Sequence, residues 1–135
     1  MTRRPTWYLA TTLLISGCGA GPTGPSASDP QDGITIYEHP QFKGISRLLL
    51  TDVEDLDDLS GGCNQNSRFD PRLNFDDCIS SIRIPPGWRV TVYEDPRYRG
   101  DSVTFTSDVQ DLDDVKGGCG GDFDDCISSI RVSRQ

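Results

Sequence analysis

The chain carries one unit twice. Residues 76–81 (Asp-Asp-Cys-Ile-Ser-Ser) return unchanged at 124–129, and Ile-Arg and a β-branched residue follow each copy. Upstream, the two copies align without a gap as far as Cys63 and Cys119. The cysteines inside the hexapeptides then align only if residues 67–74 are an insertion in the first copy, and such an insertion belongs in a surface loop. The chain should therefore form two similar substructures joined into one domain.

Apolar and polar residues alternate at the start of each copy. Ile34 and Ile36 match Val90 and Val92, and a period of two is typical of half-buried strands. Clusters of Gly, Pro and Asp between the apolar runs predict turns. We therefore expect an all-β domain. Its expected bounds are 33–135, with a first unit over about 33–86 and a second over about 88–133.

A short helical turn is predicted after the second strand of each copy. Residues 51–54 and 107–110 fit the S/T-x-x-E/Q capping box, which satisfies backbone N–H groups at a helix start. Apolar residues follow at helical spacing, so one face should pack while the acidic residues face water. The apolar set is Val53, Leu56 and Leu59 with Val109, Leu112 and Val115, and the acids of the first copy are Asp55, Asp57 and Asp58.

The repeated hexapeptide does not continue a strand pattern. Ile82 and Ile84 alternate, but Ile79 is out of phase with them, so the backbone must bend or bulge near Ser80 and Ser81. Such a bend, preceded by two aspartates, can direct carboxylate, hydroxyl and carbonyl oxygens to one point, and Ca²⁺ prefers these hard donors. The alternative is that the Asp and Ser side chains only make local Asx and Ser/Thr turns.

The N-terminal residues predict export. Residues 1–17 combine two arginines with a short apolar run, as in a secretory signal, and residues 14–18 resemble the bacterial lipobox. We expect Cys18 to become the lipidated N-terminus and residues 18–32 to form a flexible tether with a reach of about 20 Å. By analogy, Gly19 favours sorting to the outer membrane of a bacterial envelope. An ordinary signal peptide that leaves a free thiol is the alternative.

Export permits the remaining four cysteines to be oxidised. We favour the pairs Cys63–Cys78 and Cys119–Cys126 because equivalent units should be crosslinked equivalently, although four cysteines allow three pairings. A zinc site is the alternative, but neither copy has a C-x2-C pair and His39 is the only histidine.

The charge limits the possible partners. The formal net charge is −8, and removal of the two signal-peptide arginines leaves 11 Lys and Arg against 21 Asp and Glu, or about −10. Nucleic acid needs clustered Lys and Arg, which this chain lacks. Repulsion among so many carboxylates should weaken the cation-free fold, and a bound divalent ion would relieve it.

These features resemble the βγ-crystallin family, specifically its calcium-binding microbial branch, over about residues 33–133. The Y-E-x5-G hairpin signature occurs at 37–44 and 93–100, and both hexapeptides match the calcium motif of two Asn/Asp, any two residues, Ser/Thr and Ser. The resemblance implies a sandwich of two Greek-key motifs, with about eight strands in two sheets and two calcium sites that share ligands between the copies.

The resemblance also implies a ligand set, although which carboxylate crosses to the neighbouring site stays open. Disulfide bonds inside the hexapeptides would fix the binding bends and lower the ordering cost of binding. The implied ligands are the carboxylates of Asp76, Asp77, Asp124 and Asp125, the hydroxyls of Ser80 and Ser128, and the main-chain carbonyls of Glu38, Cys78, Glu94 and Cys126.

We therefore expect a calcium-binding, calcium-stabilised envelope lipoprotein with a structural, protective or adhesive role. The alternative is a module that binds a secreted or envelope protein, such as an inhibitor or toxin-like domain, with residues 67–74 as a recognition loop. A hydrolase with two aspartates is a third possibility. We expect no enzyme, because the sequence has no G-x-S-x-G, no H-E-x-x-H and no nucleophile paired with His39.

Overall fold

The computed structural model describes residues 32–64 and 73–135. The signal at 1–17, nearly all of the tether at 18–32 and most of the insertion at 67–74 lie outside these residues, so those expectations stay predictions. Within the described ranges, no helical segment has the length and hydrophobicity needed to cross a bilayer.

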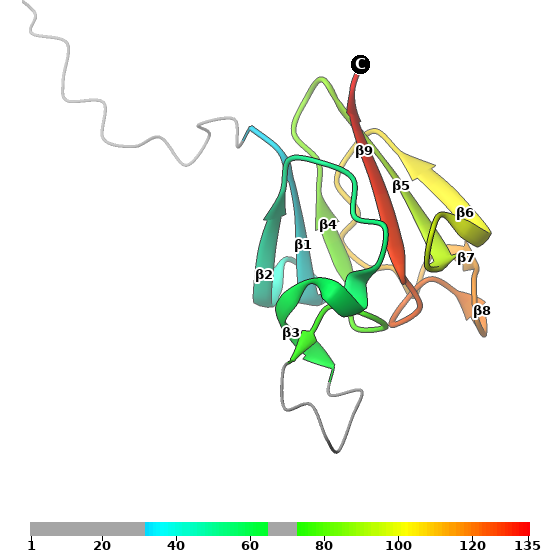
Figure 1. Cartoon of the computed structure of the whole chain (residues 1–135). Coiled ribbons are helices and arrows are strands. Elements are labelled where there is room, and N and C mark those ends of the chain that lie inside the picture. Colours follow the sequence, from blue (N-terminus) through cyan, green and yellow to red (C-terminus); the bar gives the residue numbers. More distant parts are fainter. Residues whose placement is uncertain (1–31, 65–72) are drawn as a thin grey trace, which may run out of the picture.

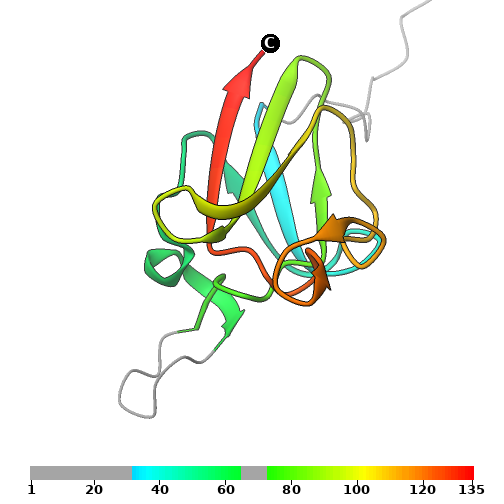
Figure 2. The same cartoon turned by 90° about the vertical axis from the view of Figure 1, so that its right-hand side faces the viewer.

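The domain is built from strands, and the predicted all-β class is confirmed (Figure 1). Two antiparallel sheets, with orders β2-β1-β4 and β6-β5-β9, form two layers, and β7 and β8 make a separate hairpin (Figure 2). Each layer therefore comes mainly from one copy of the repeat. The strands are β1 (Ile34–His39), β2 (Lys43–Leu49), β3 (Ser60–Asn64), β4 (Ser81–Arg83), β5 (Trp88–Asp95), β6 (Arg99–Phe105), β7 (Lys116–Gly117), β8 (Gly121–Asp122) and β9 (Ser129–Arg134).

Each sheet gains a fourth position from the other copy. Val53 of the first copy bridges Ile130 on β9, and Val109 of the second copy bridges Ile82 on β4. Both bridges have two backbone hydrogen bonds of 2.8 and 2.9 Å. The two copies are thus interleaved, and the eight strand positions in two sheets agree with the expected pair of Greek keys.

The predicted capping boxes do not form, because the same residues pair with the sheets. Asp52 Oδ1 accepts a hydrogen bond from Val132 N at 2.8 Å, and Asp108 Oδ1 accepts one from Ile84 N at 2.6 Å. The backbone around Val53 and its counterpart is consequently extended at the point where the sequence predicts a helix start. Tertiary strand pairing has overridden the local capping signal.

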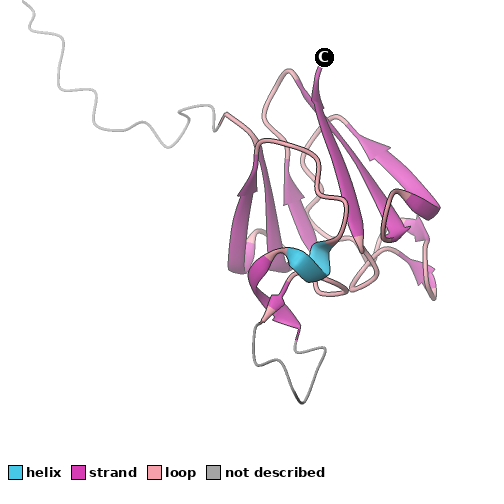
Figure 3. Cartoon of the chain, viewed as in Figure 1, coloured by secondary structure: helices cyan, strands magenta, loops and turns pink. Residues whose placement is uncertain are grey.

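A single 3-10 turn, η1 (Leu56–Asp58), follows in the first copy (Figure 3). Its N-cap is Asp55, whose carboxylate accepts the backbone N–H two residues later at 3.1 Å. Asp111 makes the same bond in the second copy without a helix. Leu56 and Leu112 are fully buried and the two aspartates of η1 are exposed, so the predicted inner and outer faces are confirmed.

The core lies between the two sheets and draws on both copies. The alternating apolar residues of β1 and β5 are fully buried, as their period predicts. Phe75 and Phe123, which directly precede the hexapeptides, are the largest of the fully buried side chains. Burial of these rings fixes the position of the residues that follow them. The buried strand residues are Ile34, Ile36, Val90 and Val92.

The turn of each sheet's first hairpin folds back over its own strands. Gln41 and Phe42 have φ of 58° and 60°, and Gly44 has φ of 81°. A Cβ on Gly44 would lie 3.0 Å from Glu38 Oε2, so this turn requires the glycine of the hairpin signature. The ring of Phe42 packs edge-on against Tyr37 with centroids 5.6 Å apart. The second hairpin repeats this geometry with Arg97, Tyr98, Gly100 and Tyr93.

Candidate metal centres

The two hexapeptides lie against each other at one end of the domain. Asp77 N donates to Ile127 O at 3.2 Å, and Asp125 N donates to Ile79 O at 3.3 Å. These reciprocal bonds connect the same positions of the two copies. The segments therefore form one paired element, from which β4 and β9 run toward the opposite end of the sheets (Figure 1).

The backbone bends at the second aspartate of each hexapeptide. Asp77 and Asp125 have φ of 48° and 49°, in the left-handed region that aspartate enters more readily than most residues. The bend was predicted near Ser80 and Ser81, and this position is wrong, because the bend lies earlier in the hexapeptide, at Asp77. Ile79 is buried together with Ile82 because it precedes β4 and does not take part in the alternation of that strand.

Carboxylates and hydroxyls meet across the two copies. Ser128 Oγ donates to Asp77 Oδ1 at 3.4 Å. In the mirror arrangement, burial raises the pKa of the Asp125 carboxyl, and the facing Ser80 side chain offsets part of that rise. The second aspartate is thus the one that crosses to the neighbouring hexapeptide, a point that the sequence left open.

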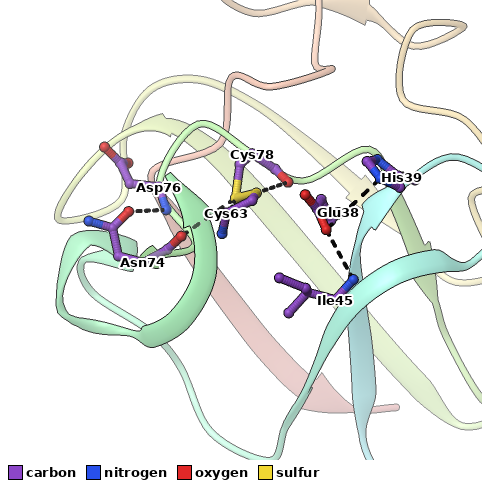
Figure 4. Close-up of a disulfide and its surroundings, with 7 residues drawn as sticks. All are labelled: Glu38, His39, Ile45, Cys63, Asn74, Asp76 and Cys78. Atoms are coloured by element: carbon purple, nitrogen blue, oxygen red, sulfur yellow. Dashed lines mark hydrogen bonds and ion pairs between the residues drawn. A yellow bond between two sulfur atoms is a disulfide. The ribbon is translucent and has the colours of Figure 1, made fainter. Parts of the chain in front are cut away.

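The central cysteines are joined to the preceding loops. The bonded pairs are Cys63–Cys78 and Cys119–Cys126, with Cα atoms 6.1 and 5.8 Å apart, so the favoured pairing is confirmed. Figure 4 shows the first pair beside Glu38 and His39. Cys63 Sγ lies 3.2 Å from the Cys78 carbonyl oxygen, but a disulfide sulfur has no hydrogen to donate. That carbonyl therefore keeps its capacity to bind a cation.

The side chains of the two glutamates are used within their hairpins. Glu38 Oε2 accepts from Ile45 N at 3.1 Å and lies 4.0 Å from His39 Nε2. Glu94 Oε2 accepts from Asp101 N at 3.3 Å. One oxygen of each carboxylate is thus engaged within its own hairpin. The neighbouring carbonyls of Tyr37 and Tyr93 accept from the backbone N–H groups of Ser80 and Ser128, which brings both loops against the hexapeptides.

One further cluster has metal-ligand composition but does not fit a metal in the oxidised protein. Atoms of Glu94, Cys119 and Cys126 lie within 4.8 Å of one another. The two sulfurs are bonded to each other, so neither is a thiolate ligand.

The first aspartate of each hexapeptide is held by a local turn. Asp76 N donates to Asn74 Oδ1, and Asp124 N donates to Asp122 Oδ1, both at 3.2 Å. The Oδ1 atom of Asp124 is buried and has no hydrogen-bond partner among the described residues. Buried polar atoms normally have a partner, so this oxygen fits a cation.

The electrostatics also favour a cation. Burial raises the pKa of the Asp77 carboxyl above its ordinary value, and the neighbouring charge of Asp76 adds to this effect. Burial and the charge of Asp124 likewise raise the pKa of Asp125. Ionisation of Asp77 and Asp125 therefore costs free energy in the folded protein, and a bound divalent ion would remove this cost. The donors are all oxygens, and these residues fit Ca²⁺ better than a softer metal.

The second serine of each hexapeptide has a structural role that the sequence did not predict. Ser81 Oγ donates to His39 O at 2.6 Å and accepts from Phe42 N at 3.0 Å. Ser129 makes the matching bonds to Asp95 O and from Tyr98 N. These buried hydroxyls hold the folded hairpins whose turns have positive φ. The repeat of both serines at one spacing was the only available signal.

Comparison with known proteins gives the family. No protein-family model matches the chain, and no curated protein does so. Among solved structures, a βγ-crystallin domain from Flavobacterium johnsoniae is 31% identical, covers 77% of this chain and 97% of its own, and has a TM-score of 0.55. The chain belongs to the βγ-crystallin family.

Other βγ-crystallin domains extend this result. The domain from Clostridium beijerinckii is 27% identical over 74% of this chain and 95% of its own, with a TM-score of 0.52. A structure bearing on the evolution of the eye-lens βγ-crystallin fold reaches a TM-score of 0.60 over 83% of this chain and 95% of its own. Its 23% identity shows the fold alone. A clostrillin double mutant, with two serines replaced by histidine, is in complex with nickel.

Proposed function

We propose that this βγ-crystallin domain binds two calcium ions, one at each crossed pair of hexapeptide residues. The observation that carries the proposal is the exchange of carboxylates between the copies, Asp77 to Ser128 and Asp125 to Ser80. Local Asx and Ser/Thr turns, the alternative role for these residues, do not explain contacts between segments that are distant in the chain.

Each site would draw on both copies of the repeat. The first would use the Ser80 hydroxyl, the Asp125 carboxylate and the carbonyls of Glu38 and Cys78. The second would use the Ser128 hydroxyl, the Asp77 carboxylate and the carbonyls of Glu94 and Cys126. The side chains of Asp76 and Asp124 would add negative charge beside the ligands. Calcium in proteins typically has six to eight oxygen ligands, and water would supply the remaining ones.

Bound calcium would supply positive charge that neutralises the facing carboxylates and connects the two copies. At about 100 times its dissociation constant, a ligand adds about 2.7 kcal/mol per site to the free energy of unfolding. That is a large fraction of the stability of a small domain. Extracellular calcium is abundant enough for weak sites to be filled.

We further propose that Cys18 carries lipid and that the domain is anchored in a bacterial envelope, at the outer membrane. Its role there would be structural, protective or adhesive and not enzymatic. The short predicted tether would keep the domain close to the membrane. Mass spectrometry of the membrane fraction tests this part, because a Cys18→Ser variant should lose both the lipid mass and the membrane association.

The calcium proposal is tested by calorimetric titration of the unlipidated Cys18→Ser protein. Two binding events are expected, and Ser80→Ala and Ser128→Ala should each weaken one of them. Ser46→Ala is the control, because Ser46 is exposed on β2 and is separated from Ser81 by the whole of β1. A thermal melt should show a higher Tm with calcium than with chelator. Oxidised protein that gives no heat and no change in Tm at millimolar calcium would refute the proposal.

A further inference from the structure

One edge of the domain exposes large apolar side chains. Leu48 and Leu50, on and just after β2, are 47% and 58% exposed. The equivalent positions of the second copy, on and just after β6, are Thr104 and Thr106. We call Leu48 and Leu50 the β2 patch. Because the two hairpins otherwise share their geometry, the repeat itself does not require apolar residues here.

The β2 patch lies where the chain enters the domain. Gly33 is buried, and a Cβ on it would lie 2.7 Å from Leu50 Cδ2 and 3.0 Å from Leu48 Cδ1. Both leucines therefore lie across the first residues of the domain. A tether from lipidated Cys18 has a predicted reach of about 20 Å, which would hold this end of the domain near the bilayer.

The charge at this end also suits a membrane. Arg47 and Arg89 are exposed near this end of the two sheets, and Arg134 is exposed but paired with an acid. Arg83 is used elsewhere, because its guanidinium lies over the Phe42 ring, 4.4 Å from the centroid. The acids here are engaged. Asp32 pairs with Arg134 at 2.6 Å, while Asp52 and Asp108 accept backbone N–H groups.

The opposite end of the strands carries the hexapeptide carboxylates and the glutamates of the hairpins, which outnumber the exposed hairpin bases Lys43, Arg97 and Arg99. The domain is therefore polarised, although its net charge is strongly negative. Anionic headgroups attract basic residues near their surface and repel acidic ones. An anionic bilayer would favour the end that holds the β2 patch over the end that holds the candidate calcium sites.

We propose that the β2 patch docks onto the anionic bilayer to which the chain is anchored, with Leu48 and Leu50 at the boundary between headgroups and acyl chains. This inference rests on the proposed lipidation of Cys18. Docking would orient the hexapeptides away from the membrane, toward the surrounding solution.

The experiment uses the lipidated protein in vesicles of phosphatidylethanolamine and phosphatidylglycerol, with and without brominated acyl chains. Tryptophan is introduced by Leu48→Trp, and the matched control is Thr104→Trp at the equivalent position. The emission of Trp88 is subtracted with the parent protein. We expect about twofold quenching by brominated lipid for Leu48→Trp and none for Thr104→Trp, because interfacial groups lie about 5–10 Å deep.

The other outcomes separate the anchor from the docking. Protein that floats with the vesicles but shows no quenching for Leu48→Trp, or equal quenching for both variants, would overturn docking while the anchor stands. If the tryptophan of Leu48→Trp is shielded from aqueous acrylamide but is not quenched by brominated lipid, a second copy of the chain covers the patch and docking onto the bilayer is wrong. Protein that does not float with vesicles would refute the anchor, and the docking with it.

Discussion

Asp77 Oδ1 accepts a hydrogen bond from Ser128 Oγ at 3.4 Å, although the two residues belong to different copies of the repeat. The next residue after Asp77 is Cys78, whose carbonyl belongs with Ser80 in the other proposed site. One short bend therefore faces two sites at once, and each site depends on the packing of both copies.

The crossing predicts which substitutions act together. Asp77→Asn and Ser128→Ala should weaken the same calcium-binding event, because their side chains meet. Asp125→Asn and Ser80→Ala should weaken the other. Calorimetric titration of the four variants checks this pairing. If Asp77→Asn and Ser80→Ala instead weaken the same calcium-binding event, each site is built from one copy and the crossed assignment is wrong.

The second serine of each hexapeptide should stabilise the fold even when no calcium is bound. Ser81→Ala removes a buried hydroxyl that makes two hydrogen bonds to the folded hairpin. The free energy of unfolding in chelator should fall by about 1–3 kcal/mol, because Phe42 N and His39 O lose their partner. Urea unfolding measures this change. Ser46→Ala, on exposed β2, should change it little, and an equal loss in both variants would contradict the role of Ser81.

The two disulfides should differ in what they contribute. The bonded residues are 15 apart for Cys63–Cys78 and 7 apart for Cys119–Cys126. Loop-closure entropy then predicts that removal of the first costs about 0.7 kcal/mol more than removal of the second. Chemical unfolding of the two double Cys→Ser variants tests the order. A larger loss from the shorter loop would show that contacts, not chain entropy, dominate.

The raised pKa of Asp77 predicts how stability depends on pH in chelator. Since the folded-state pKa lies above the unfolded value, the folded state binds more protons and charging this group destabilises it. The penalty is full above the folded pKa and disappears as the pH falls through it toward the ordinary value. Asp77→Asn should therefore stabilise the metal-free protein near neutral pH, with an advantage that shrinks on acidification.

Urea unfolding in chelator from neutral pH down to the ordinary aspartate range measures that advantage. Asp58→Asn is the control, because Asp58 is exposed on η1 and faces solvent. An advantage for Asp77→Asn that stays constant with pH would contradict the assignment, because it would not arise from a carboxyl that titrates.

Much of the fold could be predicted from the sequence, because its signals are local or repeated. The alternation at Ile34 and Ile36 identified a strand, and the duplication identified the disulfide pairs. The capping signal at residues 51–54 failed because Val53 pairs with Ile130, far away in the chain. The crossing of Asp77 to Ser128 could not be read for the same reason, since no local pattern records how two copies pack.

The exchange of Val53 and Val109 between the sheets has a consequence for how such a chain could arise. Neither half can complete its own sheet, so a gene for a single unit would yield a stable product only by assembling as a homodimer. Fusion of two such genes would convert that encounter between molecules into an intramolecular one. Each half could then diverge, and the two copies do differ at this edge, with leucines in the first and threonines in the second.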